Sequence, residues 1–270
     1  MDAQVTMLSG LRILLAEDNA TNQMVAMQML ESLGATVTLA VDGVEAVALV
    51  GQDSFDVLLV DIEMPRLSGI EMIRQVRGET GPVAGTPMLA LTAFVMREHR
   101  DAIAAAGADG VISKPILSIE RFGEEILAGM RARQAKNRAG GLAEPGAAVD
   151  QEGGGQAPVI DETAFRGLVD AVGTAALGEL LSKVEIDVRA AGQRMCGAMA
   201  AGDHAELRSA THILISVLGA IGATRMEALA REMNEAAHAG DDVAIARQVA
   251  AAEAALAATL RFVTEQQAKV

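Results

Sequence analysis

Short apolar runs alternate with amphipathic stretches through the first half of the chain. Runs rich in apolar and β-branched residues occur at 13–16, 36–39, 57–60, 88–91 and 110–113, and a helix candidate follows each of them. The run at 57–60 is apolar throughout, which is typical of a strand buried on both faces. Five strands alternating with five helices predict an α/β fold, with a doubly wound parallel sheet and right-handed crossovers.

The pattern changes after residue 158. Apolar residues recur there at helical spacing, with no convincing strand-like alternation, and Gly173, Gly202 and Gly240 separate the helical stretches. Asp161 suits the N-cap of the first of them. Short turns between the helices predict an all-α domain built as an antiparallel helical bundle. The expected helices cover residues 162–172, 175–201, 205–219, 224–239 and 242–267.

The stretch between the two halves has a different composition. Residues 135–158 contain Gly140-Gly141, Pro145 and Gly153-Gly154-Gly155, and few large apolar side chains. Such a segment cannot bury enough surface to offset the entropy cost of ordering its backbone. We therefore expect a first domain of residues 1–134, a flexible linker of residues 135–158 and a helical domain of residues 159–270.

Composition narrows the range of partners and compartments. The 270-residue chain carries a formal net charge of −14, which argues against nucleic acid or an anionic membrane as the main partner. Cys196 is the single cysteine, so no intramolecular disulfide forms, and the first residues lack a basic start and an apolar signal run. The uncharged stretches 80–96 and 209–224 are interrupted or short for a membrane span. We expect a soluble, acidic, cytoplasmic protein without membrane contact.

Polar residues terminate four of the five predicted strands. Glu17 and Asp18 follow the first strand, Asp61 the third, Thr92 the fourth and Lys114 the fifth. Because these strand ends share one edge of a parallel sheet, the side chains should converge there. Three neighbouring carboxylates repel one another unless a cation lies between them, and oxygen ligands suit Mg²⁺. The sequence therefore predicts a magnesium site at this edge.

This charge arrangement suits phosphoryl transfer. Asp61 can attack phosphorus as a carboxylate nucleophile and form an acyl phosphate, with Mg²⁺ on Glu17 and Asp18 neutralising one side of the group. Lys114 and Thr92 would contact other phosphoryl oxygens, and the reaction needs little beyond such positioning. Each residue also has a simpler explanation, since Asp18 can cap a helix and Lys114 can lie in a surface turn. The combination of four strand ends favours the phosphoryl site.

The residues around this edge resemble a known family. Over about residues 11–130, four motifs together resemble the receiver domain of two-component response regulators. Their sequences look closest to those of the receivers of hybrid histidine kinases. The motifs are Leu14-Leu15-Ala16-Glu17-Asp18-Asn19, Val60-Asp61-Ile62-Glu63-Met64-Pro65, Leu91-Thr92-Ala93 and Ser113-Lys114-Pro115. The resemblance implies a flavodoxin-like fold.

The resemblance also implies roles for individual residues. It makes Asp61 the phosphoacceptor, and it makes Glu17, Asp18, Asp61 and the Glu63 backbone carbonyl the Mg²⁺ ligands. It further implies that Thr92 and Lys114 contact the phosphoryl group. Val111 stands where receivers often carry Tyr or Phe, so this chain departs from the family pattern at the aromatic residue coupled to the threonine.

One histidine of the helical domain is predicted to lie where it can react with a phosphoryl group. His212 lies about 160° around its helix from Leu214, away from an apolar stripe, so its imidazole is expected to be exposed and available as a phosphoryl acceptor. His99, His204 and His238 are expected to face solvent without a role, and Cys196 to serve packing. The predicted core stripe comprises Leu207, Ala210, Leu214, Val217 and Ile221.

Residues 210–230 resemble the active helix and following turn of histidine phosphotransfer domains, within a likeness spanning about residues 159–265. That family usually has Lys three residues after the histidine and then Gly, where this chain has Ile215 and Ser216. Ile215 lies about 60° around the helix from His212, so no cation from that position can steady phosphohistidine. We expect Ile215 to be exposed, with Ile213 nearby, as a protein contact surface.

Two functions from different classes stay open. In the first, the chain is a phosphorelay protein: Asp61 takes phosphate from a histidine kinase, His212 exchanges phosphate with Asp61 or another receiver, and the linker keeps the modules close. In the second, the helical domain is a degenerate docking module without phosphotransfer. A metal-dependent phosphatase using Asp61 and Glu63 is a weaker third hypothesis. No kinase segment and no DNA-binding helix-turn-helix is recognised, so the partners are a histidine kinase and a downstream receiver or phosphotransfer protein.

Overall fold

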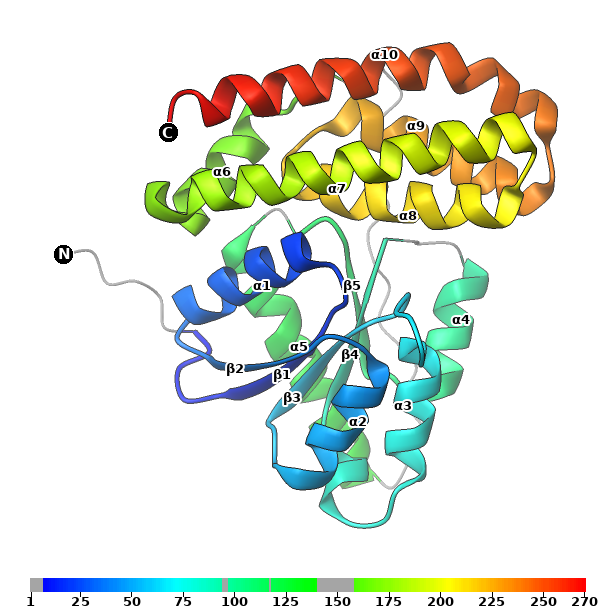
Figure 1. Cartoon of the computed structure of the whole chain (residues 1–270). Helices are drawn as coiled ribbons and strands as arrows, with labels where there is room; N and C mark the ends of the chain where they lie inside the picture. Colours follow the sequence, from blue (N-terminus) through cyan, green and yellow to red (C-terminus); the bar gives the residue numbers. More distant parts are fainter. Residues whose placement is uncertain (1–6, 94–96, 117, 140–157) are drawn as a thin grey trace. The chain divides into compact units, whose positions relative to one another are not determined.

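The structure, a computed structural model, describes residues 7–93, 97–116, 118–139 and 158–270. The chain divides into two compact units, Met1–Glu152 and Gly153–Val270, which we call the α/β unit and the helical unit. Both are drawn in Figure 1. Each unit is described by itself below.

The α/β unit is built on one parallel sheet. Its strands are β1 (Arg12–Ala16), β2 (Thr36–Ala40), β3 (Val57–Asp61), β4 (Met88–Thr92) and β5 (Gly110–Ser113). They lie in the order β2-β1-β3-β4-β5, and every neighbouring pair is parallel (Figure 1). All five residues of β3 are buried, as the continuous apolar run predicts. The predicted five-stranded parallel sheet is confirmed.

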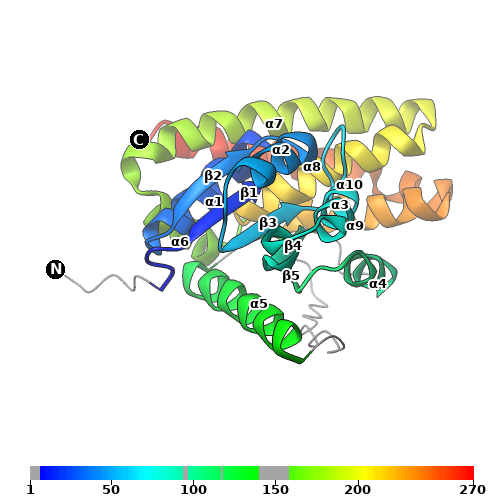
Figure 2. The same ribbon diagram turned by 90° about the horizontal axis from the view of Figure 1, so that it is seen from below.

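Helices cover both faces of this sheet (Figure 2). Helices α2 (Gly43–Gln52), α3 (Gly69–Gly78) and α4 (Arg97–Ala106) pack in sequence and share a hydrophobic core with alternate strand residues such as Leu58 and Ala90. Helix α1 (Ala20–Ser32) contacts α5 (Ile119–Ala139). Gly129 of α5 lies against Leu89, which points to the opposite side from Ala90, so α5 covers the other face.

The last helix of the α/β unit continues into the segment predicted as linker. Helix α5 runs to Ala139, so the prediction of a flexible linker is wrong for residues 135–139. Arg133 donates hydrogen bonds to the carbonyls of Ala84 and Gly85, in the short 3₁₀ helix η1 (Pro82–Gly85), at 2.5 and 3.2 Å. These contacts hold the last turns of α5 against the body of the unit. The remaining residues up to 157 lie outside the described residues.

The second unit consists of helices. They are α6 (Glu162–Val172), α7 (Thr174–Ala201), α8 (His204–Ala220), α9 (Thr224–Ala239) and α10 (Asp242–Gln267), within one residue of the predicted bounds at every end. Asp161, Asp203 and Asp241 cap three of them at the N-terminus with their carboxylates. Gly202 and Gly240 end α7 and α9 in the left-handed conformation that glycine adopts without strain.

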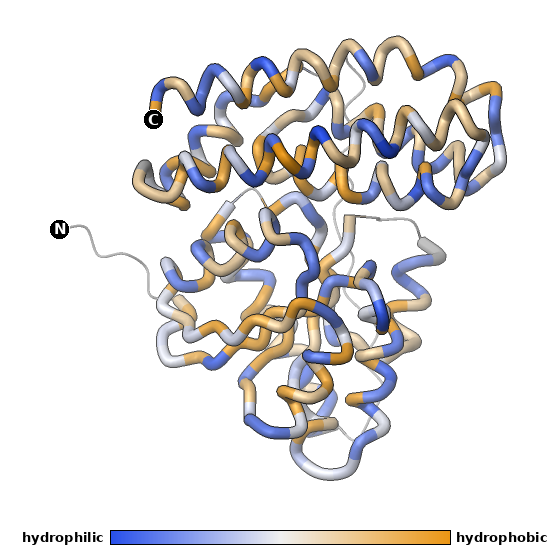
Figure 3. Tube along the Cα trace, viewed as in Figure 1, coloured by the Kyte–Doolittle hydropathy of each residue, from blue (hydrophilic) through white to orange (hydrophobic). Residues whose placement is uncertain are grey.

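The helices of this unit pack through apolar stripes. Helix α7 contacts α8, α8 contacts α9, α9 contacts α10, and α10 returns to α7, while α6 packs on α7. Residues along each helix alternate between hydrophobic and hydrophilic, whereas the strands of the α/β unit are mainly hydrophobic (Figure 3). The predicted core stripe of α8 is confirmed, because Leu207, Ala210, Leu214, Val217 and Ile221 are all buried.

Helix α10 is long and apolar enough, by length and composition, to cross a membrane. Here Ile245, Ala252, Ala255 and Val263 are buried, and the helix contacts α7 and α9. Its apolar composition is thus used, at least along this side, to build the core of the helical unit.

Candidate functional site

The parallel sheet brings the predicted site residues to one edge of the α/β unit. Glu17 and Asp18 follow β1, Asp61 is the last residue of β3, Thr92 is the last of β4, and Lys114 follows β5. All five therefore leave the sheet from its carboxyl edge, where parallel strands of doubly wound folds present their functional side chains.

Lys114 stands between two of the carboxylates. Its Nζ lies 2.6 Å from Glu17 Oε2 and 2.8 Å from Asp61 Oδ2, and all three residues are buried. Burial and the Asp61 charge raise the pKa of Glu17 to about 7, against the lowering effect of Lys114. Burial alone would lower the pKa of Lys114, but the carboxylates of Asp61 and Glu17 raise it. The ammonium group therefore stays charged beside Asp61.

Three carboxylates form a group that suits a divalent cation. One oxygen from each of Glu17, Asp18 and Asp61 lies within 4.8 Å of the others. Glu17 and Asp61 are buried while Asp18 is exposed, so the group opens toward solvent on one side. A set of oxygen donors without nitrogen or sulfur is the kind that Mg²⁺ prefers. The residues present fit the predicted metal.

Thr92 and Glu63 occupy the rim of this group. Thr92 is buried, and its carbonyl accepts a hydrogen bond from the Lys114 backbone N–H at 2.8 Å, which sets the two residues side by side. Glu63 is exposed, and its backbone N–H donates to Asp61 Oδ1 at 3.3 Å. The role of the Glu63 carbonyl stays a prediction. Val111 packs against the core shared with α2, α3 and α4.

Two amide side chains that the sequence reasoning missed hold Glu17. Asn22 Nδ2 donates to Glu17 Oε1 at 3.0 Å, and Gln23 Nε2 donates to the Glu17 carbonyl at 2.7 Å. Both come from the first turn of α1, whose N-cap is Asn19 rather than Asp18. Asp18 is thereby left at the exposed side of the carboxylate group. No spacing in the sequence distinguishes these amides from ordinary surface residues.

A glycine fixes the backbone beside Asp61. A Cβ atom on Gly69 would lie 2.1 Å from the Asp61 carbonyl oxygen, far inside contact distance, and the Gly69 N–H donates to the Ile62 carbonyl at 3.0 Å. The start of α3 can therefore approach the end of β3 only with glycine at this position. Ser68 and Glu71 form a capping box there. The Ser-x-x-Glu spacing is a sequence signal that could have located this helix start.

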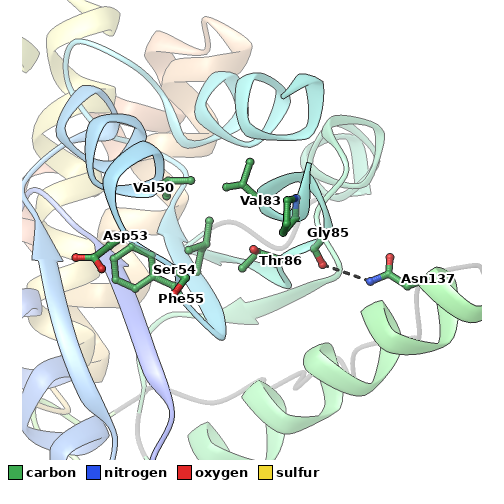
Figure 4. A pocket seen from close by; sticks show the side chains of 10 residues that line it. Val50, Asp53, Ser54, Phe55, Val83, Gly85, Thr86 and Asn137 are labelled. Atoms are coloured by element: carbon green, nitrogen blue, oxygen red, sulfur yellow. Dashed lines mark hydrogen bonds between the residues drawn. The ribbon is translucent and has the colours of Figure 1, made fainter. Parts of the chain in front are cut away.

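A cavity of about 630 Å³ lies at the opposite end of the α/β unit. Val50, Phe55 and Val83 line it with other mainly apolar groups, and Asn137 of α5 closes one side by donating to the Gly85 carbonyl at 3.4 Å (Figure 4). Phe55 precedes β3 and so belongs to the amino edge of the sheet. The cavity is therefore separate from the acidic group.

The structure corrects two expectations in the helical unit. The imidazole of His212, expected to be exposed, is only half-buried on α8, and its Nδ1 atom is buried. Ile215, expected to be exposed beside it, is fully buried, and Ile213 is half-buried. Helical spacing places Ile215 one position after the Leu214 stripe, and packing widened that stripe to include it. The expected apolar surface at Ile215 is wrong.

His204 and Cys196 of the helical unit both lie in defined surroundings. His204 Nε2 lies 2.8 Å from Asp242 Oδ1, which links the starts of α8 and α10, a contact that the sequence did not predict. Cys196 is half-buried, and burial raises the pKa of its thiol. A raised thiol pKa agrees with a packing role rather than a reactive one.

Comparison with known proteins identifies the first unit. Residues 13–126 match the response regulator receiver domain family. This segment is a receiver domain of two-component signalling, of the kind found in hybrid histidine kinases and response regulators. The match does not extend to the helical unit.

Each of three similar proteins matches less than half of this chain, and the chain spans at most half the length of the two full-length relatives. Histidine kinase 5 of Arabidopsis thaliana is 34% identical, over 43% of this chain and 15% of that protein. The response regulator MprA of Mycobacterium tuberculosis is 41% identical, over 46% of this chain and 50% of that protein. The receiver domain of a Pseudomonas aeruginosa sensor histidine kinase is 32% identical with a TM-score of 0.43, over 46% of this chain and 99% of that domain, and its crystal structure holds a magnesium ion in the active-site cleft.

Proposed function

We propose that this chain is a phosphorelay protein in which Asp61 accepts a phosphoryl group from a histidine kinase in a Mg²⁺-dependent reaction. One observation carries the proposal: Glu17, Asp18, Asp61 and Lys114 gather at one sheet edge inside a segment of the receiver family. The chain would act as a phosphoacceptor in the cytoplasm and not as a kinase.

The geometry supports the following reaction at Asp61. A carboxylate oxygen of Asp61 attacks the phosphorus of a kinase phosphohistidine, an O–P bond forms, and the N–P bond breaks with its electron pair returning to the imidazole. Lys114, 2.8 Å from Asp61 Oδ2, balances the negative charge that Asp61 and the phosphoryl oxygens share. Thr92 would donate its hydroxyl proton to a phosphoryl oxygen. Glu17, Asp18, Asp61 and the Glu63 carbonyl would hold Mg²⁺, which supplies positive charge to the phosphoryl group.

We propose further that the helical unit is a histidine phosphotransfer-like antiparallel bundle and that His212 exchanges phosphate with Asp61 or with a separate receiver. An imidazole nitrogen of His212 would attack the acyl phosphate, the O–P bond would break, and the aspartate would regain its carboxylate. The partial exposure of His212 on α8 supports this assignment.

A docking role for the helical unit is the alternative, and a specific observation favours it. Ile215 occupies the position where a lysine would face phosphohistidine, and it is fully buried. Position 215 therefore supplies no positive charge beside His212. In this alternative the unit binds a kinase or an output protein, and Asp61 phosphorylation alone carries the signal.

Labelling with acetyl phosphate tests the assignment of Asp61. The full chain with MgCl₂ should gain the mass of one phosphoryl group. Hydroxylamine should remove this label, because it cleaves acyl phosphates. Asp61→Asn should abolish the label, whereas Asp53→Asn should retain it, because Asp53 lies exposed at the cavity end of the unit. A full stoichiometry of label on Asp61→Asn would refute the assignment.

The role of His212 is tested by phosphotransfer profiling against receivers. Acid-labile, alkali-stable phosphate on the wild type that disappears in His212→Gln supports exchange. Absence of such a label with every receiver tested supports the docking alternative.

A further inference from the structure

Two polar side chains beside His212 are buried and bonded to each other. Thr211, the residue before His212 in α8, is fully buried, and Asn234 of α9 is 1% exposed. Asn234 Nδ2 donates a hydrogen bond to Thr211 Oγ1 at 2.8 Å. This bond joins α8 to α9 one residue from the imidazole.

The same amide group also contacts the backbone that carries His212. Asn234 Nδ2 donates to the Arg208 carbonyl at 3.0 Å, and in an α-helix the carbonyl of residue 208 accepts the backbone N–H of residue 212. Thr211 Oγ1 donates to the Leu207 carbonyl at 2.7 Å. The helical turn that carries His212 is thus attached to α9 through both a side chain and a carbonyl.

Stability alone does not account for this pair. Asn234 Oδ1 is buried without a hydrogen-bond partner, and a buried acceptor left unpaired destabilises the folded state. Two apolar side chains of similar shape would fill the space without that cost. A directional hydrogen bond contributes something that apolar packing does not, since it is satisfied at one rotation of α8 about its axis against α9 and broken at others.

We propose that Thr211 and Asn234 are positioning residues for His212. Rotation of a helix about its axis swings every side chain by the same angle, so the bond that sets the rotation of α8 also sets the direction of the imidazole. Phosphoryl transfer between two protein groups depends strongly on such alignment. The inference rests on the proposed exchange at His212 and adds to it the residues that orient the imidazole.

The test compares two routes by which phosphate reaches His212 in the full chain. Phosphoramidate labels histidine directly and needs no alignment of two protein groups. Acetyl phosphate loads Asp61, from which the group must pass to His212. With Thr211→Val and Asn234→Leu combined, we expect the second route to slow about tenfold or more, with direct labelling and the melting temperature preserved.

Two variants serve as controls. Thr211→Ser, with Asn234 unchanged, keeps the hydroxyl and should transfer phosphate from Asp61 to His212 at the wild-type rate. Thr259→Val removes the hydroxyl of another fully buried threonine, which donates to the Ala255 carbonyl of its own helix α10 at 3.0 Å, and it should alter neither route. Wild-type transfer in the double variant would overturn the inference. So would an equal loss by both routes together with a lower melting temperature, because that result describes a purely structural pair.

An NMR measurement that needs no phosphate tests the positioning role of Thr211 and Asn234 independently of the proposed phosphoryl exchange at His212. The ring resonances of His212 in the NMR spectrum, assigned with His212→Gln, should be single and sharp in the wild type and broadened or split in the double variant. If the wild type is not labelled from Asp61, this spectrum decides the inference by itself. Unchanged His212 resonances in the double variant would then overturn it.

Discussion

The acidic edge of the α/β unit and the His212 turn of the helical unit hold their polar groups by different means. At the acidic edge, charged groups from three strands neutralise one another, with Lys114 between Glu17 and Asp61. At the His212 turn, neutral groups from two helices are joined by the hydrogen bond between Thr211 and Asn234. A site made of buried charges depends on every member, whereas the direction of a side chain on a helix depends on how that helix is rotated against its neighbour.

Removal of the central cation should give the largest effect. Lys114→Met leaves Glu17 and Asp61 buried without their counter-charge, so we expect the free energy of unfolding at neutral pH to fall by about 3–5 kcal/mol without Mg²⁺, and phosphorylation of Asp61 to be lost. Urea unfolding measures the first effect and acetyl phosphate labelling the second.

The matched variant in the helical unit is Lys183→Met. Lys183 pairs with Glu179 on the exposed side of α7 at 2.9 Å, so its loss should cost less than about 1 kcal/mol. Equal losses in the two variants would show that the acidic edge does not depend on its cation.

A methyl group beside Asp61 should have the next largest effect. Gly69→Ala places a Cβ atom against the Asp61 carbonyl, so the end of β3 or the start of α3 must move, and we expect slower phosphorylation and a lower melting temperature. Gly197→Ala is the counterpart in α7, where no atom lies within 4 Å of the added Cβ. That variant should be more stable by about 0.5–1 kcal/mol, because alanine favours helix over glycine. A stable, fully active Gly69→Ala protein would contradict the close approach.

The pH dependence of Mg²⁺ binding should be a smaller effect confined to the α/β unit. Burial raises the pKa of Glu17 to about 7, so the folded protein holds the Glu17 proton more tightly than the unfolded chain does. Without metal, the contribution of this group to stability is therefore greatest at low pH and declines as pH rises from 4.5 to about 7. Mg²⁺ must displace the same proton, so its affinity should rise up to about tenfold per pH unit below this pKa.

Titration of the melting temperature with Mg²⁺, one pH unit below and one above that pKa, measures this dependence. Glu17→Gln carries no such proton and should lose the pH dependence. A Mg²⁺ affinity in the wild type that is constant across this range would show that Glu17 is ionised throughout.

The smallest effect is expected where a half-buried histidine and an exposed carboxylate join two helices. His204→Gln removes the contact with Asp242, 80% of whose side chain is exposed, so we expect a change below about 1 kcal/mol. Urea unfolding at a pH where histidine is protonated provides the measurement. A loss as large as that of Lys114→Met would remove the contrast between the two units.

Local sequence patterns were sufficient to predict the strands and helices and the charged residues that gather at the acidic edge. Apolar runs of strand length, followed by a carboxylate, threonine or lysine, located β1, β3, β4 and β5 and their terminal residues. Parallel topology then made Glu17, Asp18, Asp61 and Lys114 meet at one edge. Helical spacing, with Asp161 as an N-cap and glycines between the helical stretches, placed the helices of the second unit to within one residue.

Partners distant in sequence were decided only by the tertiary structure. The contact of Arg133 with the η1 carbonyls and the bond between Asn234 and Thr211 depend on how finished elements pack. So does the burial of Ile215, which helical spacing placed beside the core stripe without showing how wide that stripe is. Periodicity reports which side of an element faces a core, because it is a property of one segment. Which atoms meet across the core depends on the distance and rotation between segments, and these exist only once the chain has folded.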